Sequence, residues 1–135
     1  MKNYETLEHP SDLKIKAFGK TKEELFLYAM LAMEESLEPE IIKKEKIKRE
    51  IKIKSLDFQS LLVDFLSEIL YKNQIEKEAY NSIKFKILTD MILEAEVSGE
   101  KVERFGEDIK AVTYHDLDVH QEKDGSWQAT ILFDV

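Results

Sequence analysis

Two stretches of the chain place their apolar residues at the spacing of an amphipathic helix. Over residues 57–71 the apolar positions follow the i, i+3, i+4, i+7 repeat of one helix face, at Phe58, Leu61, Leu62, Phe65, Leu66, Ile69 and Leu70. Ser55 or Asp57 can cap the N-terminus of this helix. A second helix is predicted to begin at the capping box that starts with Thr21 and to stop before Pro39. The longer apolar stripe makes the 57–71 helix the expected centre of the core.

Much of the remaining chain shows strand-like patterns, most clearly where apolar and polar residues alternate, which is the period of a half-buried β-strand. Strands are predicted within residues 14–18, 47–53, 83–87, 92–97, 110–119 and 127–133. Asp124-Gly125 lies between the last two and predicts a hairpin. The stretch from Tyr4 to Gly19 contains two short strands, split by a loop at Pro10. The predicted fold class is α+β, with two helices packed on a largely antiparallel β-sheet in a single domain.

The composition limits the classes of protein that this chain can belong to. A chain of 135 residues with 43% hydrophobic residues suits one domain, residues 1–135, with a real core. The 20 basic and 28 acidic residues give a net charge of −8, which argues against free-standing binding to nucleic acid but leaves action through a basic partner open. The absence of cysteine excludes disulfides, thiolate metal sites and thiol catalysis. No apolar run has the length of a membrane span and no secretory signal is recognisable, so we expect a soluble cytoplasmic protein without membrane contact.

The familiar catalytic motifs are missing, so we predict no catalytic residues. The chain has no P-loop, no Gly-rich dinucleotide turn and no Gly-x-Ser-x-Gly sequence. His115 and His120 lie five residues apart on a predicted strand, which puts them on opposite faces and makes them a poor metal pair. Asp116 and Asp118 would share a strand face, either as a metal pair or as part of an acidic surface. Lys110 can pair with a nearby acid, contact a phosphate or carboxylate of a partner, or face solvent.

Oxygen ligands gather at the C-terminal end of the sequence. Asp134 follows an apolar strand and is followed by Val135, so a side-chain carboxylate and a terminal carboxylate are adjacent. Asp12, in the loop broken by Pro10, can add a third oxygen group. Such hard ligands suit Ca²⁺, Mg²⁺ or Mn²⁺ better than a soft metal. The alternative is a solvated chain end without a ligand.

Several ordered motifs resemble those of the archease family over nearly the whole chain. The His-Thr-Ala-Asp motif of that family is matched by residues 9–12, His-Pro-Ser-Asp, and its Gly-Lys-Thr by residues 19–21. The most specific match is residues 109–115, Ile-Lys-Ala-Val-Thr-Tyr-His. The chain also ends as archeases do, with an apolar residue, Asp and a small aliphatic residue. Pro10 and Ser11 depart from the family motif, but His9 and Asp12 on either side of them are kept.

This resemblance implies a function that the residues alone do not reveal. Archeases are protein cofactors of the GTP-dependent tRNA-splicing RNA ligase, whose active-site histidine they help to guanylylate and whose multiple turnover they permit. The resemblance implies a divalent metal site at Asp12, Asp134 and Val135, with Ca²⁺ as the expected ion and Mg²⁺ or Mn²⁺ as alternatives. It also implies that Lys110 activates the partner, while His9 and His115 are possible supporting residues. The expected partner is the ligase, with tRNA contacted only indirectly, and the protein itself is expected not to be an enzyme.

Two other functions remain open at this point. The domain can be a chaperone-like or scaffolding module whose acidic surface binds nucleic-acid enzymes, with a purely structural metal. A hydrolytic enzyme is the third possibility, although no motif supports it.

Overall fold

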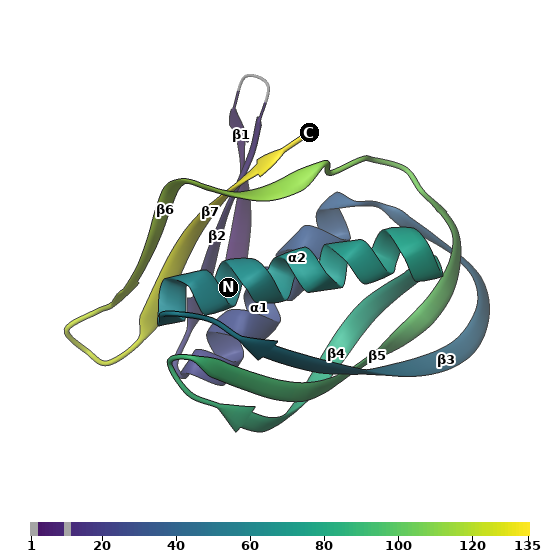
Figure 1. Ribbon diagram of the computed structural model, residues 1–135. Coiled ribbons are helices and arrows are strands. Elements are labelled where there is room, and N and C mark those ends of the chain that lie inside the picture. The colour runs from purple at the N-terminus through teal and green to yellow at the C-terminus, as the bar shows by residue number, and fades with distance from the viewer. Residues whose placement is uncertain (1–2, 10–11) are drawn as a thin grey trace.

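The computed structural model describes residues 3–9 and 12–135, which form two antiparallel sheets and two helices (Figure 1). Sheet A has the strand order β1 (Tyr4–His9), β2 (Asp12–Gly19), β7 (Trp127–Asp134), β6 (Ala111–Gln121). Sheet B has the order β3 (Pro39–Lys54), β5 (Ile92–Phe105), β4 (Glu78–Leu88). Pro10 and Ser11, which depart from the family motif, lie outside the described residues, so the loop expected at Pro10 stays a prediction.

The two helices begin where the sequence predicts. The Thr21 hydroxyl accepts a hydrogen bond from the backbone N–H of Glu24 at 3.1 Å and caps α1 (Lys22–Ser36). Asp57 caps α2 (Phe58–Glu76) by accepting from the N–H of Ser60 at 2.7 Å. The alternative cap, Ser55, instead donates to Asp64 at 2.6 Å. The second helix continues past the predicted end at residue 71 and stops at Lys77, whose left-handed conformation, with φ of 55°, ends it.

Both helices lie between the sheets and contact strands of each. The helix α1 packs on β1, β2 and β7 of sheet A and on β4 of sheet B, while α2 packs on β6 and on β3 and β4. One cluster of buried side chains joins all these layers, and five of the seven predicted apolar positions of α2 are fully buried in it, namely Leu61, Leu62, Phe65, Leu66 and Ile69. The predicted α+β class with antiparallel strands is confirmed. The strands form two sheets because the helices cover the inner face of each and separate them.

A β-bulge in β6 changes the expected pattern of faces on that strand. Thr113 pairs with Leu132 and Asp118 pairs with Thr130, so four residues of β6 oppose a single residue of β7. Asp116 has a left-handed φ of 54° within this bulge. Strict alternation therefore fails between residues 113 and 118. The expectation that Asp116 and Asp118 share a strand face, either as a metal pair or as part of an acidic surface, loses its basis, although both residues are exposed.

Among the described residues, no helix is long and apolar enough to cross a membrane.

Candidate functional site

Strand register brings Asp12 and Asp134 together at one end of sheet A. Asp12 at the start of β2 is directly opposite Asp134 at the end of β7, and Asp134 is in turn opposite Ala111 at the start of β6. Residues directly opposite one another project from the same face, with Cβ atoms about 4.5–5.5 Å apart. The two residues, far apart in the sequence, therefore lie side by side where β7 ends. Figure 1 shows β2 next to β7.

Lys110 is fixed to the same end of the sheet through its backbone. Its N–H donates to the carbonyl oxygen of Asp134 at 2.7 Å, and its side chain is exposed. The preceding carbonyl, that of Ile109, accepts from the side-chain amide of Gln74 on α2 at 3.1 Å, while the Ile109 side chain is buried. A buried neighbour and two hydrogen bonds thus hold the backbone of Lys110 in place and leave its ammonium group free to reach outward.

A groove of about 450 Å³ opens beside these residues. Asp12 and Val135 line it, together with four further acids, from the C-terminal end of α1 and from the segment before β6: Glu35, Glu38, Glu107 and Asp108. These four acids were not among the site residues predicted from the sequence. One available signal was the run of acids at the end of α1, where negative charge opposes the helix dipole.

The donor set at this end of the sheet fits a hard divalent cation. Asp12, Asp134 and Val135 offer oxygen ligands only, as Ca²⁺, Mg²⁺ and Mn²⁺ prefer. Within the part of the chain that the structure describes, no three side chains of His, Asp or Glu are grouped closely enough to hold a metal ion. Among the described residues, a cation here would draw on the two aspartates and the main-chain oxygens of Val135.

The two histidines expected to support the site are placed differently. Strand pairing puts His9 opposite Asp12, in the same row of the sheet as Asp134, but its side chain lies outside the described residues. His115 belongs to the bulge of β6 and is exposed, with its Nε2 3.7 Å from a carboxylate oxygen of Asp116. The strand register therefore brings His9, and not His115, into the row of the two aspartates.

The most strongly perturbed ionisable groups lie in a separate buried network, where the chain leaves α2. Glu78 is fully buried and accepts two hydrogen bonds from the Arg49 guanidinium at 2.7 and 2.9 Å. Burial on its own raises the pKa of Glu78, but hydrogen bonds from Arg49, Tyr80 and Lys101 outweigh this effect and lower the pKa to about 2. This network joins β3, β4 and β5, so its role is structural.

A second buried acid, Glu34, belongs to the same region. Asn73 donates from its side-chain amide to both carboxylate oxygens of Glu34, at 2.8 and 3.0 Å. Burial raises the pKa of Glu34 to about 8, although hydrogen bonds from Asn73 and from the Tyr80 backbone act in the opposite direction. Glu34 is therefore mostly protonated at neutral pH.

Comparisons with known proteins agree over the whole chain. Residues 4–135 match the model of the Archease protein family (MTH1598/TM1083). The protein archease of Methanosarcina barkeri is 38% identical over 146 residues, covering 99% of this chain and 97% of the relative. That of Pyrococcus furiosus is 32% identical over 142 residues and is covered completely, as is this chain.

Solved structures show the same fold. The solution structure of Methanobacterium thermoautotrophicum protein 1598 matches with a TM-score of 0.70 and 29% identity, over 100% of both chains. The crystal structure of a Thermotoga maritima archease, described as a possible chaperone, matches with a TM-score of 0.69 and 22% identity, over 97% of this chain and 96% of that one. The chain belongs to the archease family.

Proposed function

We propose that this chain is a protein activator of a GTP-dependent tRNA-splicing RNA ligase. In this proposal it promotes the metal-dependent guanylylation of the ligase's active-site histidine and allows multiple turnover in tRNA splicing or RNA repair. Family membership supports the proposal, and the observation that carries it is the register of sheet A, which pairs Asp12 with Asp134 beside the start of β6.

Each of the site residues has a distinct part in this proposal. Asp12, Asp134 and Val135 would hold a divalent cation, with Ca²⁺ preferred and Mg²⁺ or Mn²⁺ as alternatives. When bound, such a cation neutralises phosphate charge and orients a phosphorylated ligand. Lys110, exposed on a backbone that is hydrogen-bonded to Asp134, would contact a phosphate or carboxylate of the ligase.

The charge of the chain also supports an indirect role with RNA. A net charge of −8 disfavours free-standing binding to a phosphodiester backbone, whereas it suits contact with a basic protein that itself holds the RNA. In our proposal, therefore, the ligase binds the tRNA, whereas this chain binds the ligase and the cation.

The test is a guanylylation assay with purified ligase, GTP and a titrated divalent ion. Asp12→Asn and Lys110→Ala should each reduce the stimulation of ligase guanylylation at least about tenfold, the effect of losing one charge-assisted contact. Matched controls are Glu45→Gln on β3 and Lys123→Ala in the β6–β7 hairpin, both exposed and away from the site. Circular dichroism should show that all four variants keep the wild-type fold. Full stimulation by both site variants would exclude this assignment.

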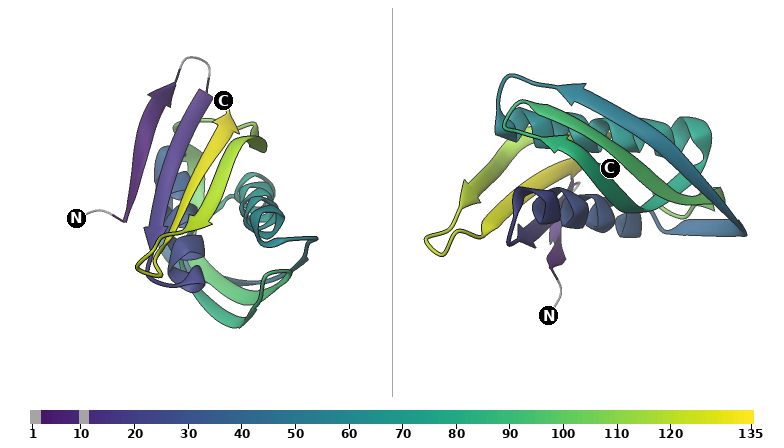
Figure 2. Two further views of the ribbon diagram at one scale, coloured as in Figure 1. Left: turned by 90° about the vertical axis from the view of Figure 1, so that its left-hand side faces the viewer. Right: turned by 90° about the horizontal axis from the view of Figure 1, so that it is seen from below.

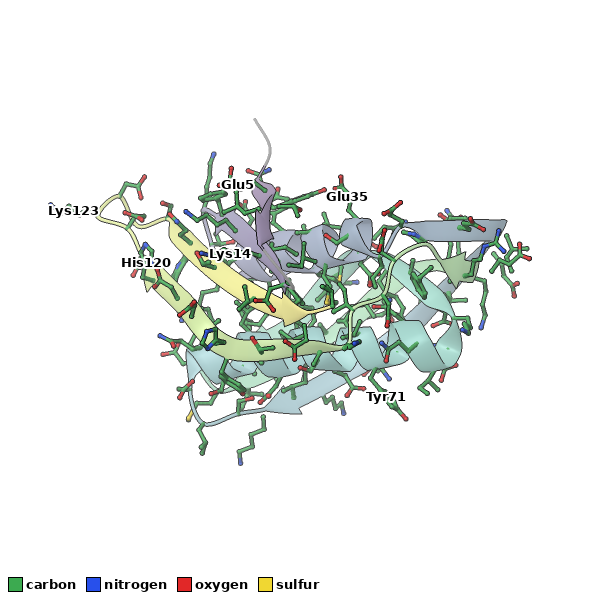
Figure 3. The ribbon with its side chains drawn as sticks, turned by 90° about the horizontal axis from the view of Figure 1, so that it is seen from above. Glu5, Lys14, Glu35, Tyr71, His120 and Lys123 are labelled. Atoms are coloured by element: carbon green, nitrogen blue, oxygen red, sulfur yellow. The ribbon has the colours of Figure 1, made fainter. Side chains whose placement is uncertain are left out.

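A chaperone-like role is the second candidate, and exposed apolar side chains on α2 favour it. Tyr71 and Ile75 lie one turn apart and are 57% and 61% exposed. Figure 3 shows Tyr71 projecting away from α2. Equal protection of unrelated client proteins from aggregation, without metal-dependent stimulation of the ligase, would favour this candidate.

A further inference from the structure

The face of sheet A that carries Asp12 and Asp134 also carries two lysines. In β2 the buried Ile15 and Ala17 alternate with the partly exposed Lys14 and Lys16, so the lysines project from the face opposite to the core. Asp12 is two residues before Lys14 in the same strand, so it projects from the same face as the two lysines. In the left-hand view of Figure 2 the strands of sheet A lie in front of α1, and no helix covers this outer face.

Both lysines are only partly exposed, and each lies beside a nearly buried residue of β7. Lys14 is directly opposite Leu132 and Lys16 is directly opposite Thr130 on β7. Leu132 and Thr130 are only 5% and 9% exposed although they point away from the helices. The side chains of neighbouring strands must therefore cover them, and the aliphatic stems of the paired lysines are in position to do so. Figure 3 shows Lys14 beside the strands of this sheet.

Among the described residues, no ion pair is formed by Lys14 or Lys16, although the chain has an excess of acidic residues. The outer face of sheet B differs, because there Lys48 and Lys52 lie 3.9 and 3.8 Å from Glu96 and Glu94. Lys14 and Lys16 thus present two positive charges in line with Asp12, and the exposed Glu5 of β1 is directly opposite Lys16.

We propose that Lys14 and Lys16 bind the phosphate chain of a nucleoside triphosphate whose divalent cation is held by Asp12 and Asp134. The inference rests on the proposed function, since it requires the cation. Residues i and i+2 of a strand are about 7 Å apart, so Asp12, Lys14 and Lys16 form a line that extends about 13 Å. A cation at the first position and ammonium groups at the next two complement several negative charges on one small ligand.

Charge density favours a triphosphate over RNA as the ligand. A triphosphate concentrates its charge within reach of one cation and two ammonium groups, whereas a phosphodiester strand spreads single charges along its length and would meet the net charge of −8. Without a cation, the carboxylates of Asp12 and Asp134 repel the phosphates. The cation and the nucleotide should therefore bind cooperatively. The cation raises the affinity for the nucleotide by the same factor as the nucleotide raises the affinity for the cation.

The experiment is a ¹⁵N–¹H NMR titration of the protein alone, without ligase, with GTP as the probe and Ca²⁺ in excess over the nucleotide. The expected result is saturable shifts of amides in 12–16 and 130–134 that Ca²⁺ alone does not produce. Guanosine, which has no phosphate, should produce none. A short single-stranded RNA should bind more weakly than GTP, and tighter binding of the RNA to the same amides would overturn the triphosphate assignment.

The variant for this test is K14Q/K16Q, which keeps part of each aliphatic stem over Leu132 and Thr130 and removes the charges. It should weaken GTP binding about tenfold or more while it still binds Ca²⁺ in the absence of nucleotide. The matched control K48Q/K52Q removes the same charge from sheet B and should bind GTP as the wild type does. Unchanged GTP binding by K14Q/K16Q, or no GTP binding by the wild type loaded with Ca²⁺, would overturn this inference. Neither result would bear on ligase stimulation, which the guanylylation assay measures separately.

Discussion

At the scale of single residues, the contact between Arg49 and Glu78 should contribute more to stability than any surface ion pair. Glu78 is fully buried, and the Arg49 guanidinium is bonded to both of its carboxylate oxygens. Arg49→Met keeps an aliphatic side chain but leaves the buried carboxylate without its main partner. We expect a loss of about 3 kcal/mol in the free energy of unfolding, measured by urea denaturation.

The matched control for this prediction is Arg104→Met. Arg104 lies 2.8 Å from Glu40, but their side chains are 69% and 51% exposed, so water screens the pair. The control should cost less than about 1 kcal/mol. Equal losses for the two variants would mean that burial of Glu78 does not determine the strength of its ion pair.

Glu34 should make the protein less stable as the pH rises towards 8. Burial raises its pKa from 4.5 to about 8, so the folded state keeps a proton that the unfolded state releases between these values. The contribution of Glu34 to the free energy of unfolding is therefore fully present below pH 4.5 and is lost as the pH rises through about 8. Between these values the free energy of unfolding falls by up to about 1.4 kcal/mol per pH unit. Glu34→Gln has no proton to lose and should show a flatter dependence in urea denaturation at pH 5, 6, 7 and 8.

The difference between wild type and variant isolates this effect from other groups. His120 lies between Glu122 and Asp118, which raise its pKa. Its contribution to the stability of the folded state is therefore also lost as the pH rises above 6.5. Its contribution is present in both proteins and cancels in the difference. Parallel pH profiles for the two proteins would show that Glu34 is already ionised in the folded state.

At the scale of the secondary-structure elements, the start of α2 depends on one side chain. Asp57 accepts from the N–H of Ser60 at 2.7 Å, so Asp57→Ala leaves that N–H without its cap. The expected cost is about 1 kcal/mol, seen as a lower urea midpoint with an unchanged m-value. Gln59→Ala, an exposed change in the first turn that removes no cap, is the control and should stay within about 0.5 kcal/mol. A cost for Asp57→Ala no larger than the control's would indicate that Ser55 or water replaces the cap.

Helix starts and strand positions were predictable because their signals are local. A capping residue followed by an apolar stripe specifies α2 within a few residues, and Asp124-Gly125 specifies the β6–β7 hairpin. The division into two sheets was not predictable, because strand pairing depends on which faces the helices cover. The bulge of β6 was missed for a similar reason, since the four residues that oppose one residue of β7 include no Gly or Pro that would mark the irregularity.

The candidate site shows the same limit. Asp12 and Asp134 were expected to cooperate, and the β2–β7 register places them directly opposite one another. The two aspartates are close because strands at the two ends of the sequence pair with each other. No local sequence pattern encodes this pairing. The acids at the end of α1 reach the groove through helix packing, so their place beside Asp12 became evident only in three dimensions.

At the scale of the whole molecule, a cation at the aspartate pair should stabilise the fold, because the unfolded chain separates its ligands. A ligand that binds only the folded state adds about 2.7 kcal/mol when its concentration is 100 times its Kd. For a domain of this size we expect Ca²⁺ to raise Tm by roughly 5–10 °C over the chelator-treated protein, as measured by calorimetry. Asp134→Asn should abolish the rise, whereas Glu45→Gln, a charge change on the other sheet, should preserve it. If Asp134→Asn gains as much from Ca²⁺ as the wild type does, the cation binds elsewhere, and both the metal site and the triphosphate site built on it lose their basis.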